Sequence, residues 1–323
     1  MEKERNITFD YVKGLAILSI VIGHLYYFSG RYQGALVFEI CDCIELPVFM
    51  YVSGLLAHVS IDRYGFRKLL ATRCIRLLFP LFSFYIIKSL QKPYLWTIFW
   101  LEEYKIGYWF MLVLFELMIT LSFVKSLATR LGVKSYWVNG AFFGLVVLFV
   151  VLLPKDSIVY QVLCVKLYAH YYPFFMLGYY SYRIDRWLTM RYAPVYLLAF
   201  VVAFCFYHNG FRVMKIACNL SSLLFLMTVC QSPRKPLQQV FAYVGINSLQ
   251  VYLLHFFLLF QLLKVLPVVE NRWLEFAYYL LVAVAIIAVT IGVARLLMKN
   301  SWLAMFLFGI RRKKPVPVNP ADS

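Results

Sequence analysis

Residues 9–28 read FDYVKGLAILSIVIGHLYYF, a long run dominated by apolar side chains. A helix needs about 20 mainly apolar residues to span the hydrocarbon core of a bilayer, and this run is long enough. Comparable runs recur along the whole chain, at residues 36–59, 74–90, 107–125, 136–153, 160–181, 193–208, 213–230, 245–265 and 275–298. The pattern therefore predicts an all-α fold, a polytopic transmembrane helical bundle of about ten spans.

The composition excludes most other classes of protein. Of the 323 residues, 63% are hydrophobic and only 15% are charged, whereas an ordinary soluble domain is about half apolar and about a quarter charged. A water-soluble core cannot hide that excess, so a cytosolic enzyme, a disordered chain and a secreted disulfide scaffold are excluded. The apolar runs are continuous rather than alternating, which also excludes a transmembrane barrel.

The chain is strongly basic, with 32 Lys and Arg against 15 Asp and Glu and a formal net charge of +17. In a membrane protein, basic residues gather in the cytoplasmic loops, so we expect this charge to orient the chain and not to bind nucleic acid. With the N-terminus in the cytoplasm, most basic residues fall on that side, which predicts both termini there. We expect one transmembrane domain over residues 1–310, a basic cytoplasmic tail over 311–323, and a location in the cell membrane.

Motifs of soluble enzymes are missing from the sequence. It contains no phosphate-binding glycine loop, no zinc pattern and no nucleophile elbow. The seven cysteines lie mostly within apolar runs and lack metal-ligand spacing, so we expect small buried side chains and no metal site. Chemistry must therefore come from polar residues inside the predicted spans.

The first span carries Asp10, Lys13 and His24, and ionisable groups inside a membrane are costly enough to suggest function. Lys13 and His24 are eleven residues apart, which puts them within about 20° of the same helix face and roughly 16 Å apart along the axis. Gly14 on this face would let another helix approach closely. Two structural alternatives stay open: a local ion pair between Asp10 and Lys13, and an interhelical hydrogen bond for His24.

The second span holds the acids Glu39, Asp42 and Glu45, followed by Pro47 and Ser53. The three acids cover too wide an arc for all of them to face lipid without a large cost. Pro47 removes a backbone donor and is expected to kink or break the helix, which is tolerated where backbone lines a cavity. These features favour a polar cavity, and a proton or cation path is the competing interpretation.

Arg73 and Arg76 stand at the start of the third span, at positions i and i+3, which share one face of an α-helix. Paired guanidinium groups suit the phosphate groups of a ligand. Anchoring of a cytoplasmic loop by positive charge is the simpler alternative.

Further candidates lie in later spans. Tyr108 and Trp109 would offer a stacking surface for a sugar ring, or belong to an interfacial aromatic belt. Glu116 follows in the same span. Asn247 and Ser248 are typical of a helix start, and His255, about two turns beyond, is either a packing residue or a member of a site.

Taken in order, these fragments resemble the integral-membrane acyltransferase 3 family, most closely its fucose 4-O-acetylase-like branch. The matching segments are Asp10-Tyr-Val-Lys13-Gly14 with His24, Leu46-Pro47-Val48-Phe49 with Ser53-Gly54, Arg73-x-x-Arg76 with Phe79-Pro80, Tyr108-Trp109-Phe110, Phe174-Phe-Met-Leu-Gly178, and Gly245-x-x-Ser248-Leu249 with Tyr252-Leu-Leu-His255. They extend over most of the chain. Glu45 departs from the pattern, because that branch often has a histidine before the proline.

The resemblance implies about ten spans and the transfer of an acyl group, most often acetyl from acetyl-CoA, to a hydroxyl of a cell-surface polysaccharide or lipid-linked glycan. It implies a catalytic His24, acting as general base or accepting the acyl group itself, and no tightly bound cofactor. Residues expected to bind the phosphates of acetyl-CoA on the cytoplasmic side are Lys13, Arg73 and Arg76. Acids that could orient the imidazole are Asp10, Asp42 and Glu45. Residues expected around the acceptor, which would enter from the outer side, or along the cavity are Ser53, Tyr108, Trp109, Glu116 and His255.

Two other functions remain open from the sequence. In a transporter or glycan exporter, Glu39, Asp42, Glu45 and His255 would form a proton or ion relay. In a glycan-synthesis complex, the chain would be a non-catalytic membrane partner. Binding of acetyl-CoA distinguishes the enzyme from both.

Overall fold

The computed structural model describes residues 7–63, 66–92, 94–181, 187–231, 235–267 and 269–310. Within these ranges the regular structure is entirely helical, which confirms the all-α prediction. The α-helices are α1 Ile7–Phe28, α2 Leu36–Arg63, α3 Phe66–Arg73, α4 Phe79–Gln91, α5 Leu95–Leu101, α6 Trp109–Leu131, α7 Ser135–Leu152, α8 Ile158–Val162, α9 Val165–Tyr179, α10 Ala193–His208, α11 Met214–Val229, α12 Lys235–Ile246, α13 Ser248–Leu262, α14 Arg272–Leu297 and α15 Ser301–Phe308. The predicted tail, 311–323, lies outside the described residues.

The chain is a multi-pass membrane protein. Among the described residues, 7 helices are long and apolar enough to cross a membrane, or up to 8 if the bent pair α12 and α13 is counted as one span. The predicted run at 160–181 forms the short helices α8 and α9, and the run at 213–230 forms α11, a shorter apolar helix. The count of ten spans and the side on which the termini lie therefore stay predictions.

The predicted run at 245–265 coincides with α13, and α13 forms a bent pair with α12, the helix before it. The chain bends by 74° between Pro236–Ile246 and Ser248–Leu262, and Asn247 begins the second helix as the sequence indicated. The first helix of this bent pair, α12, is not a long apolar run, because it is short and carries polar residues such as Gln238 and Gln239. Pro47 does not end α2, which continues as one helix to Arg63.

Two pairs of helices cross in close backbone contact at glycines. At the crossing of α1 and α12, a Cβ on Gly14 would overlap the carbonyl of Phe241, and one on Gly245 would overlap the carbonyl of Asp10. At the crossing of α2 and α9, a Cβ on Gly54 or Gly178 would likewise overlap a carbonyl of the other helix. Small residues at such crossings let membrane helices pack through their backbones, where lipid provides no hydrophobic drive.

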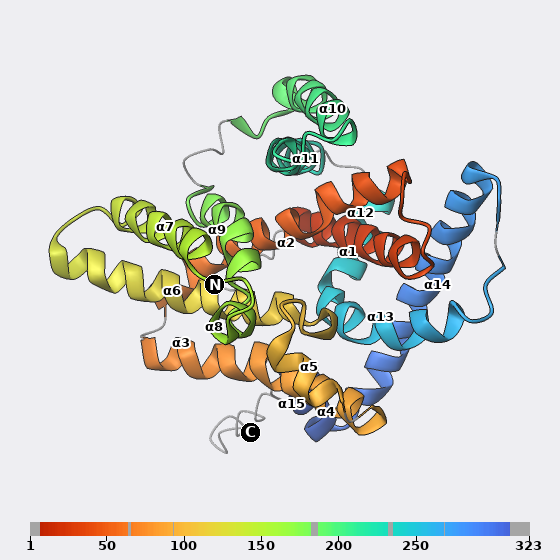
Figure 1. Ribbon diagram of the computed structural model, residues 1–323, viewed down its shortest axis with the longest axis horizontal. Coiled ribbons are helices and arrows are strands. Elements are labelled where there is room, and N and C mark those ends of the chain that lie inside the picture. The colour runs from red at the N-terminus through yellow and green to blue at the C-terminus, as the bar shows by residue number, and fades with distance from the viewer. Residues whose placement is uncertain are drawn as a thin grey trace, which may run out of the picture.

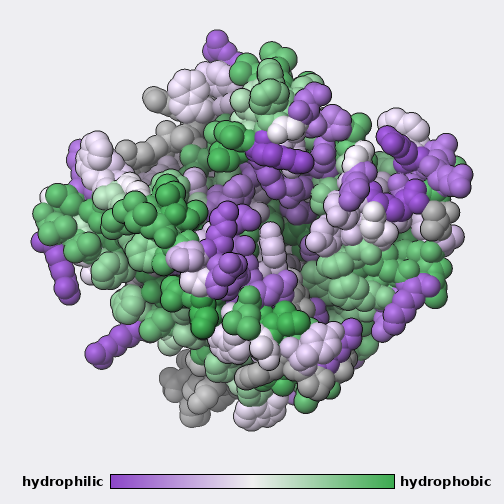
Figure 2. Space-filling model, in the orientation of Figure 1, coloured by the Kyte–Doolittle hydropathy of each residue, from purple (hydrophilic) through white to green (hydrophobic). Residues whose placement is uncertain are grey.

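The polar and apolar surfaces are separated. Figure 1 shows α10 and α11 together at one edge of the molecule, where α11 packs against α2. Figure 2 shows the face that Figure 1 presents to the viewer. Hydrophilic residues gather over its middle, with apolar areas over α6 and α7 on one side and over α13 and α14 on the other. Helices such as α7 and α14 expose large apolar side chains along their length, as a lipid-facing helix does.

A π-helical turn, Cys74–Leu78, joins α3 to α4 and carries Arg76. The N–H of Phe79 donates to the carbonyl of Cys74, five residues back, and Pro80 follows directly. Because the proline ring would clash with the carbonyl of Arg76 in a regular α-helix, a wider turn accommodates it. The spacing of Arg73 and Arg76 predicts one shared face in a regular α-helix, whereas Arg76 lies in the π turn; Arg73 is half-buried and Arg76 is exposed.

Candidate active site

A cavity of about 980 Å³ lies between α1, α2, α4, α9, α11 and α13. Its wall is mainly apolar, but ionisable side chains from helices far apart in the sequence meet in it. These are His24, Asp42, Glu45, Lys88, Glu102, Lys166, His170, Arg212 and Lys215. Because charged groups in a membrane are costly, so many around one space indicate a binding or reaction chamber. We call it the central cavity.

Two histidines meet at one side of the central cavity. Nδ1 of His24, on α1, is 2.9 Å from Nε2 of His255, on α13. His24 is half-buried and lines the cavity, whereas His255 is completely buried behind it. Nδ1 of His255 is 3.0 Å from the carbonyl oxygen of Val251 and 2.8 Å from that of Tyr252. The pair thus links the cavity to the backbone of α13.

Aromatic rings and one ammonium group surround the two imidazoles. The ring of Phe256 lies 4.9 Å from that of His24, centroid to centroid. The buried ammonium of Lys88, on α4, lies 4.6 Å over the ring of Tyr108 and 4.7 Å over that of Phe256, within electrostatic range of both histidines. Cation–π contacts of this kind hold a charge in a largely apolar setting.

The loop at 102–108 contributes Glu102, Tyr104 and Gly107 to the cavity lining and is fixed to α13. The hydroxyl of Tyr252 donates to the carbonyl of Gly107, at 2.7 Å, and the hydroxyl of Tyr108 donates to the carbonyl of Leu253, at 3.2 Å. Lys105 has φ 48 and donates from its buried amine to the carbonyls of Glu102 and Gln161. Burial lowers the pKa of that amine. These bonds hold α13 and the loop together as one support for His255.

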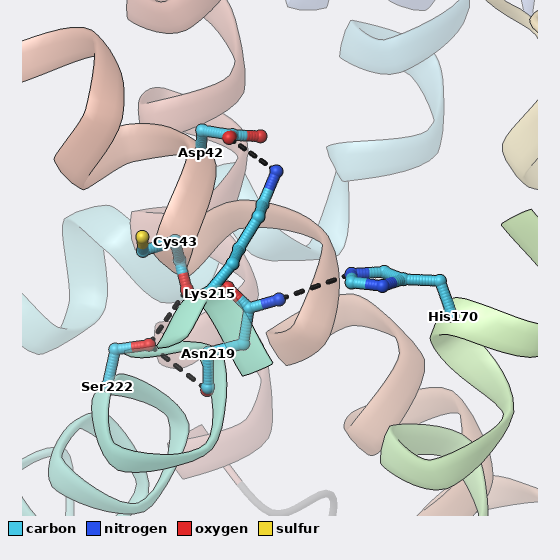
Figure 3. A network of polar contacts seen from close by, with 6 residues as sticks. All are labelled: Asp42, Cys43, His170, Lys215, Asn219 and Ser222. Carbon is cyan, nitrogen blue, oxygen red and sulfur yellow. Dashed lines mark hydrogen bonds and ion pairs between the residues drawn. The ribbon is translucent and has the colours of Figure 1, made fainter. Parts of the chain in front are cut away.

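A polar network from α2, α9 and α11, drawn in Figure 3, contributes Asp42, His170 and Lys215 to the cavity lining. Nζ of Lys215 is 2.5 Å from Oδ2 of Asp42, and the Asn219 amide is hydrogen-bonded to Nε2 of His170 at 3.4 Å. The hydroxyl of Ser222 donates to the carbonyl of Cys43, at 2.8 Å. We call these residues the polar wall: Asp42, Cys43, His170, Lys215, Asn219 and Ser222.

The acids of α2 differ in their surroundings. Glu39 pairs with His208 of α10 at 2.7 Å, outside the cavity lining, and Asp42 pairs with Lys215. Glu45 is buried on the cavity, and its Oε2 has no hydrogen-bond partner among the residues that the structure describes. A Cβ on Gly23, the residue before His24, would lie 3.3 Å from that oxygen. One acceptor group therefore remains available beside His24.

A comparison with family sequence profiles identifies the class of protein. The sequence profile of the acyltransferase 3 family, described as an acyltransferase domain, matches residues 6–295. The chain belongs to the acyltransferase 3 family. The match includes α1, the polar wall and α13, so one family domain provides every part of the central cavity.

Two curated relatives match this acyltransferase 3 chain over a short stretch. Both are nodulation protein NolL, from Sinorhizobium fredii at 35% identity over 82 residues and from Mesorhizobium japonicum at 32% over 83 residues. Each match covers 24% of this chain and 22% of the relative. The chain thus spans about a fifth of the length of these relatives. No solved structure matches it.

The family fragments of this acyltransferase 3 chain have different structural roles. Four glycines within them, Gly14, Gly54, Gly178 and Gly245, form the two close helix crossings. Asp10 and Lys13 form an ion pair of 2.7 Å, the local alternative that the sequence left open, and Lys13 does not line the central cavity. Arg73 and Arg76 do not line it either. Their assignment to acetyl-CoA stays a prediction.

The remaining candidates fall into three places. Trp109 lines the cavity, and its ring stacks on that of Tyr171 with centroids 5.3 Å apart. Tyr108 is completely buried and Trp109 is buried as well. Neither Tyr108 nor Trp109 therefore belongs to a lipid-facing aromatic belt. Glu116 and Ser53 lie away from the cavity lining, and Oε1 of Glu116 is buried without a hydrogen-bond partner among the described residues.

The imidazole of His24 is held by another imidazole and not by one of the three expected acids. Asp10 and Asp42 are paired with lysines, and Glu45 is the acid that remains on the cavity beside α1. The sequence analysis missed Lys88 and Lys215 as site residues. Both are isolated lysines inside apolar runs, which is the signal that could have found them.

Proposed function

We propose that this chain is a membrane O-acyltransferase that moves an acetyl group from acetyl-CoA to a hydroxyl of a cell-surface or lipid-linked glycan. Membership of a family described as an acyltransferase domain supports acyl transfer. The observation that carries the proposal is His24: its ring lines a large cavity, and its Nδ1 is already engaged by His255. The second ring nitrogen, Nε2, is then the one that can meet a substrate.

The reaction needs a base near neutrality, and imidazole is the side chain best suited to deprotonate a hydroxyl as it attacks. In the proposed step, Nε2 of His24 takes the hydroxyl proton while the acceptor oxygen attacks the thioester carbonyl. The C–S bond then breaks, the acetyl group stays on the acceptor oxygen as an ester, and the proton returns from His24 to the thiolate of CoA. His24 is thus unchanged after one turnover.

Arg73 and Arg76 remain the proposed site for the phosphates of CoA. Guanidinium groups form paired, charge-assisted hydrogen bonds with phosphate oxygens, and Arg76 is exposed enough to meet a ligand from solution. Lys13 lies near the start of α1, and His24 near its end, roughly 16 Å further along the helix. We propose that the donor enters from the side of Lys13 and the acceptor from the other side.

The acceptor is proposed to lie between His24 and the polar wall. Asp42, Lys215 and His170 offer both donors and acceptors of hydrogen bonds, which suits the many hydroxyls of a sugar. Trp109 adds an aromatic surface on the same cavity. Assignment to the fucose 4-O-acetylase-like branch, and to the cell membrane in particular, is part of this proposal.

The test uses the full chain in lipid nanodiscs with acetyl-CoA carrying label in the acetyl group. We expect saturable binding and slow release of labelled acetate, which becomes transfer when a suitable glycan is added. We expect no glycan flux through the same chain in sealed vesicles. Absence of acetyl-CoA binding, together with glycan flux that depends on Asp42 and Glu45, would contradict the proposal and support an exporter.

A further inference from the structure

We propose that His255 is a positioning residue that fixes His24 in the tautomer with its proton on Nδ1, so that Nε2 is the base. This inference rests on the proposed function and adds a residue to it. His255 does not line the central cavity, so it acts through His24 and not on the substrate.

The argument starts at the backbone of α13. Nδ1 of His255 is within hydrogen-bond distance of two carbonyl oxygens, those of Val251 and Tyr252, at 3.0 and 2.8 Å. A carbonyl oxygen accepts hydrogen bonds and never donates one. Nδ1 of His255 must therefore carry a proton, which it shares between the two oxygens.

The other nitrogen of His255 determines what His24 does. A neutral imidazole has one donor nitrogen and one acceptor nitrogen, so a neutral His255 with its proton on Nδ1 has an acceptor at Nε2. That atom is 2.9 Å from Nδ1 of His24, which must donate to it. Nε2 of His24 then holds the free electron pair.

The geometry of the two rings supports a true hydrogen bond. Their planes are only 9° apart, and their centroids are 5.1 Å apart. Two stacked rings cannot bring nitrogens as close as 2.9 Å, so the imidazoles of His24 and His255 lie edge to edge in nearly one plane. The N–H of one ring therefore points along the electron pair of the other, which is the favourable arrangement.

The groups around His255 favour its neutral form. Its ring is completely buried, and the ammonium of Lys88 on α4 is within electrostatic range. Tyr108 of the neighbouring loop and Tyr252 of α13 use their hydroxyls on backbone carbonyls, so neither donates to the ring of His255. A second buried cation beside Lys88 would be costly, and it would leave His24 without an acceptor for its Nδ1 proton.

The consequence appears when His24 takes a proton from the acceptor hydroxyl. The positive charge of the imidazolium is then shared through its Nδ1–H with Nε2 of His255, which stabilises the charge without taking the proton. This is the role that a carboxylate has in a catalytic triad, here given to a neutral imidazole held by backbone.

The test compares three substitutions of His255. His255→Leu fills the space but provides no acceptor, His255→Asn provides an amide near the position of Nδ1, and His255→Gln can place its oxygen near Nε2. We expect kcat for acetyl transfer to fall by at least about tenfold in the Leu and Asn variants, with acetyl-CoA affinity unchanged. In the Gln variant we expect kcat to be several-fold higher than in the Leu variant. Size-exclusion profiles and thermal unfolding of each variant establish that it is folded.

A second readout does not depend on turnover. In the full chain with ¹⁵N-labelled histidine, solid-state NMR in lipid distinguishes a protonated from an unprotonated ring nitrogen, and His24→Gln identifies the signals of His24. We expect a protonated Nδ1 and an unprotonated Nε2 on His24, and the loss of this preference in His255→Leu. A proton on Nε2 of His24 in the unsubstituted chain, or a folded His255→Leu variant with unchanged kcat, would overturn the inference. If His24 has its proton on Nδ1 but the chain does not bind acetyl-CoA, the proposed function is wrong. His255 would then fix the tautomer of His24 without a part in acetyl transfer, which would also overturn its role as a positioning residue.

Discussion

Nζ of Lys215 on α11 lies 2.5 Å from Oδ2 of Asp42 on α2, an ion pair that joins two helices on the wall of the central cavity. The two side chains are 29% and 26% exposed, so both keep some contact with water and breaking the pair costs less than it would at a fully buried site. Breaking the pair should therefore leave the fold intact and reveal any role in binding.

We predict that Asp42→Asn raises the KM for the glycan acceptor about tenfold and changes kcat much less, because a charge-assisted hydrogen bond to the substrate is lost. Release of acetate from acetyl-CoA without acceptor should stay unchanged. The measurement is steady-state transfer at varied acceptor concentration.

Glu39→Gln is the matched control for Asp42→Asn. It breaks a comparable pair on the same helix, between Glu39 and His208, which does not line the cavity. Equal effects of Glu39→Gln and Asp42→Asn on the KM would mean that the ion pairs serve packing alone.

The arginines beside the π turn give a second prediction. Substituting Arg73→Gln and Arg76→Gln together should weaken binding of acetyl-CoA at least about tenfold, because two charge-assisted contacts with phosphate are removed. The measurement is equilibrium binding of labelled acetyl-CoA in nanodiscs. Arg67→Gln removes an equal charge from α3, within two turns of Arg73, and should bind normally. Unchanged affinity in the double variant would leave Arg73 and Arg76 as topological anchors only.

The helix crossings give a third prediction. Gly178→Ala should lower the free energy of unfolding by about 1–3 kcal/mol, because the added Cβ would overlap the carbonyl of Tyr51 on α2. Gly144→Ala on α7 is the matched control, since nothing lies within 4 Å of a Cβ at that position. Thermal unfolding in one detergent compares the two. Equal stability of both variants would show that α2 and α9 do not need backbone contact.

The approximate position of several long helices could be predicted because their signal is local. The runs at 9–28, 36–59 and 275–298 each coincide with one long helix, since a span must be apolar over its whole length. The same criterion overlooked α12, which crosses α1 closely at Gly245 and is not a long apolar run. The π turn before Pro80 is also local in origin, but sequence spacing alone treated it as regular helix.

The candidate site could be predicted only in part, because its decisive contacts join distant residues. His24 was recognisable as a polar residue in an apolar run, but its partner His255 lies 231 positions away and reaches it only through the bend at Asn247. An acid was the expected partner, since carboxylates commonly orient imidazoles. In the fold, α11 places Lys215 against Asp42, so this acid pairs with an ammonium group while His24 pairs with His255. Such pairings depend on which helices are neighbours, which the apolar pattern does not specify.

The most direct test of the central claim is a single-turnover measurement of acetyl transfer by His24→Ala, with His208→Ala as a control that removes a histidine outside the cavity lining. Both variants should insert and bind acetyl-CoA as the unsubstituted chain does. The account predicts that His24→Ala transfers acetyl at least about 100-fold more slowly, as expected for loss of a general base, and that His208→Ala is unaffected. Transfer by a folded His24→Ala variant at the unsubstituted rate would contradict it.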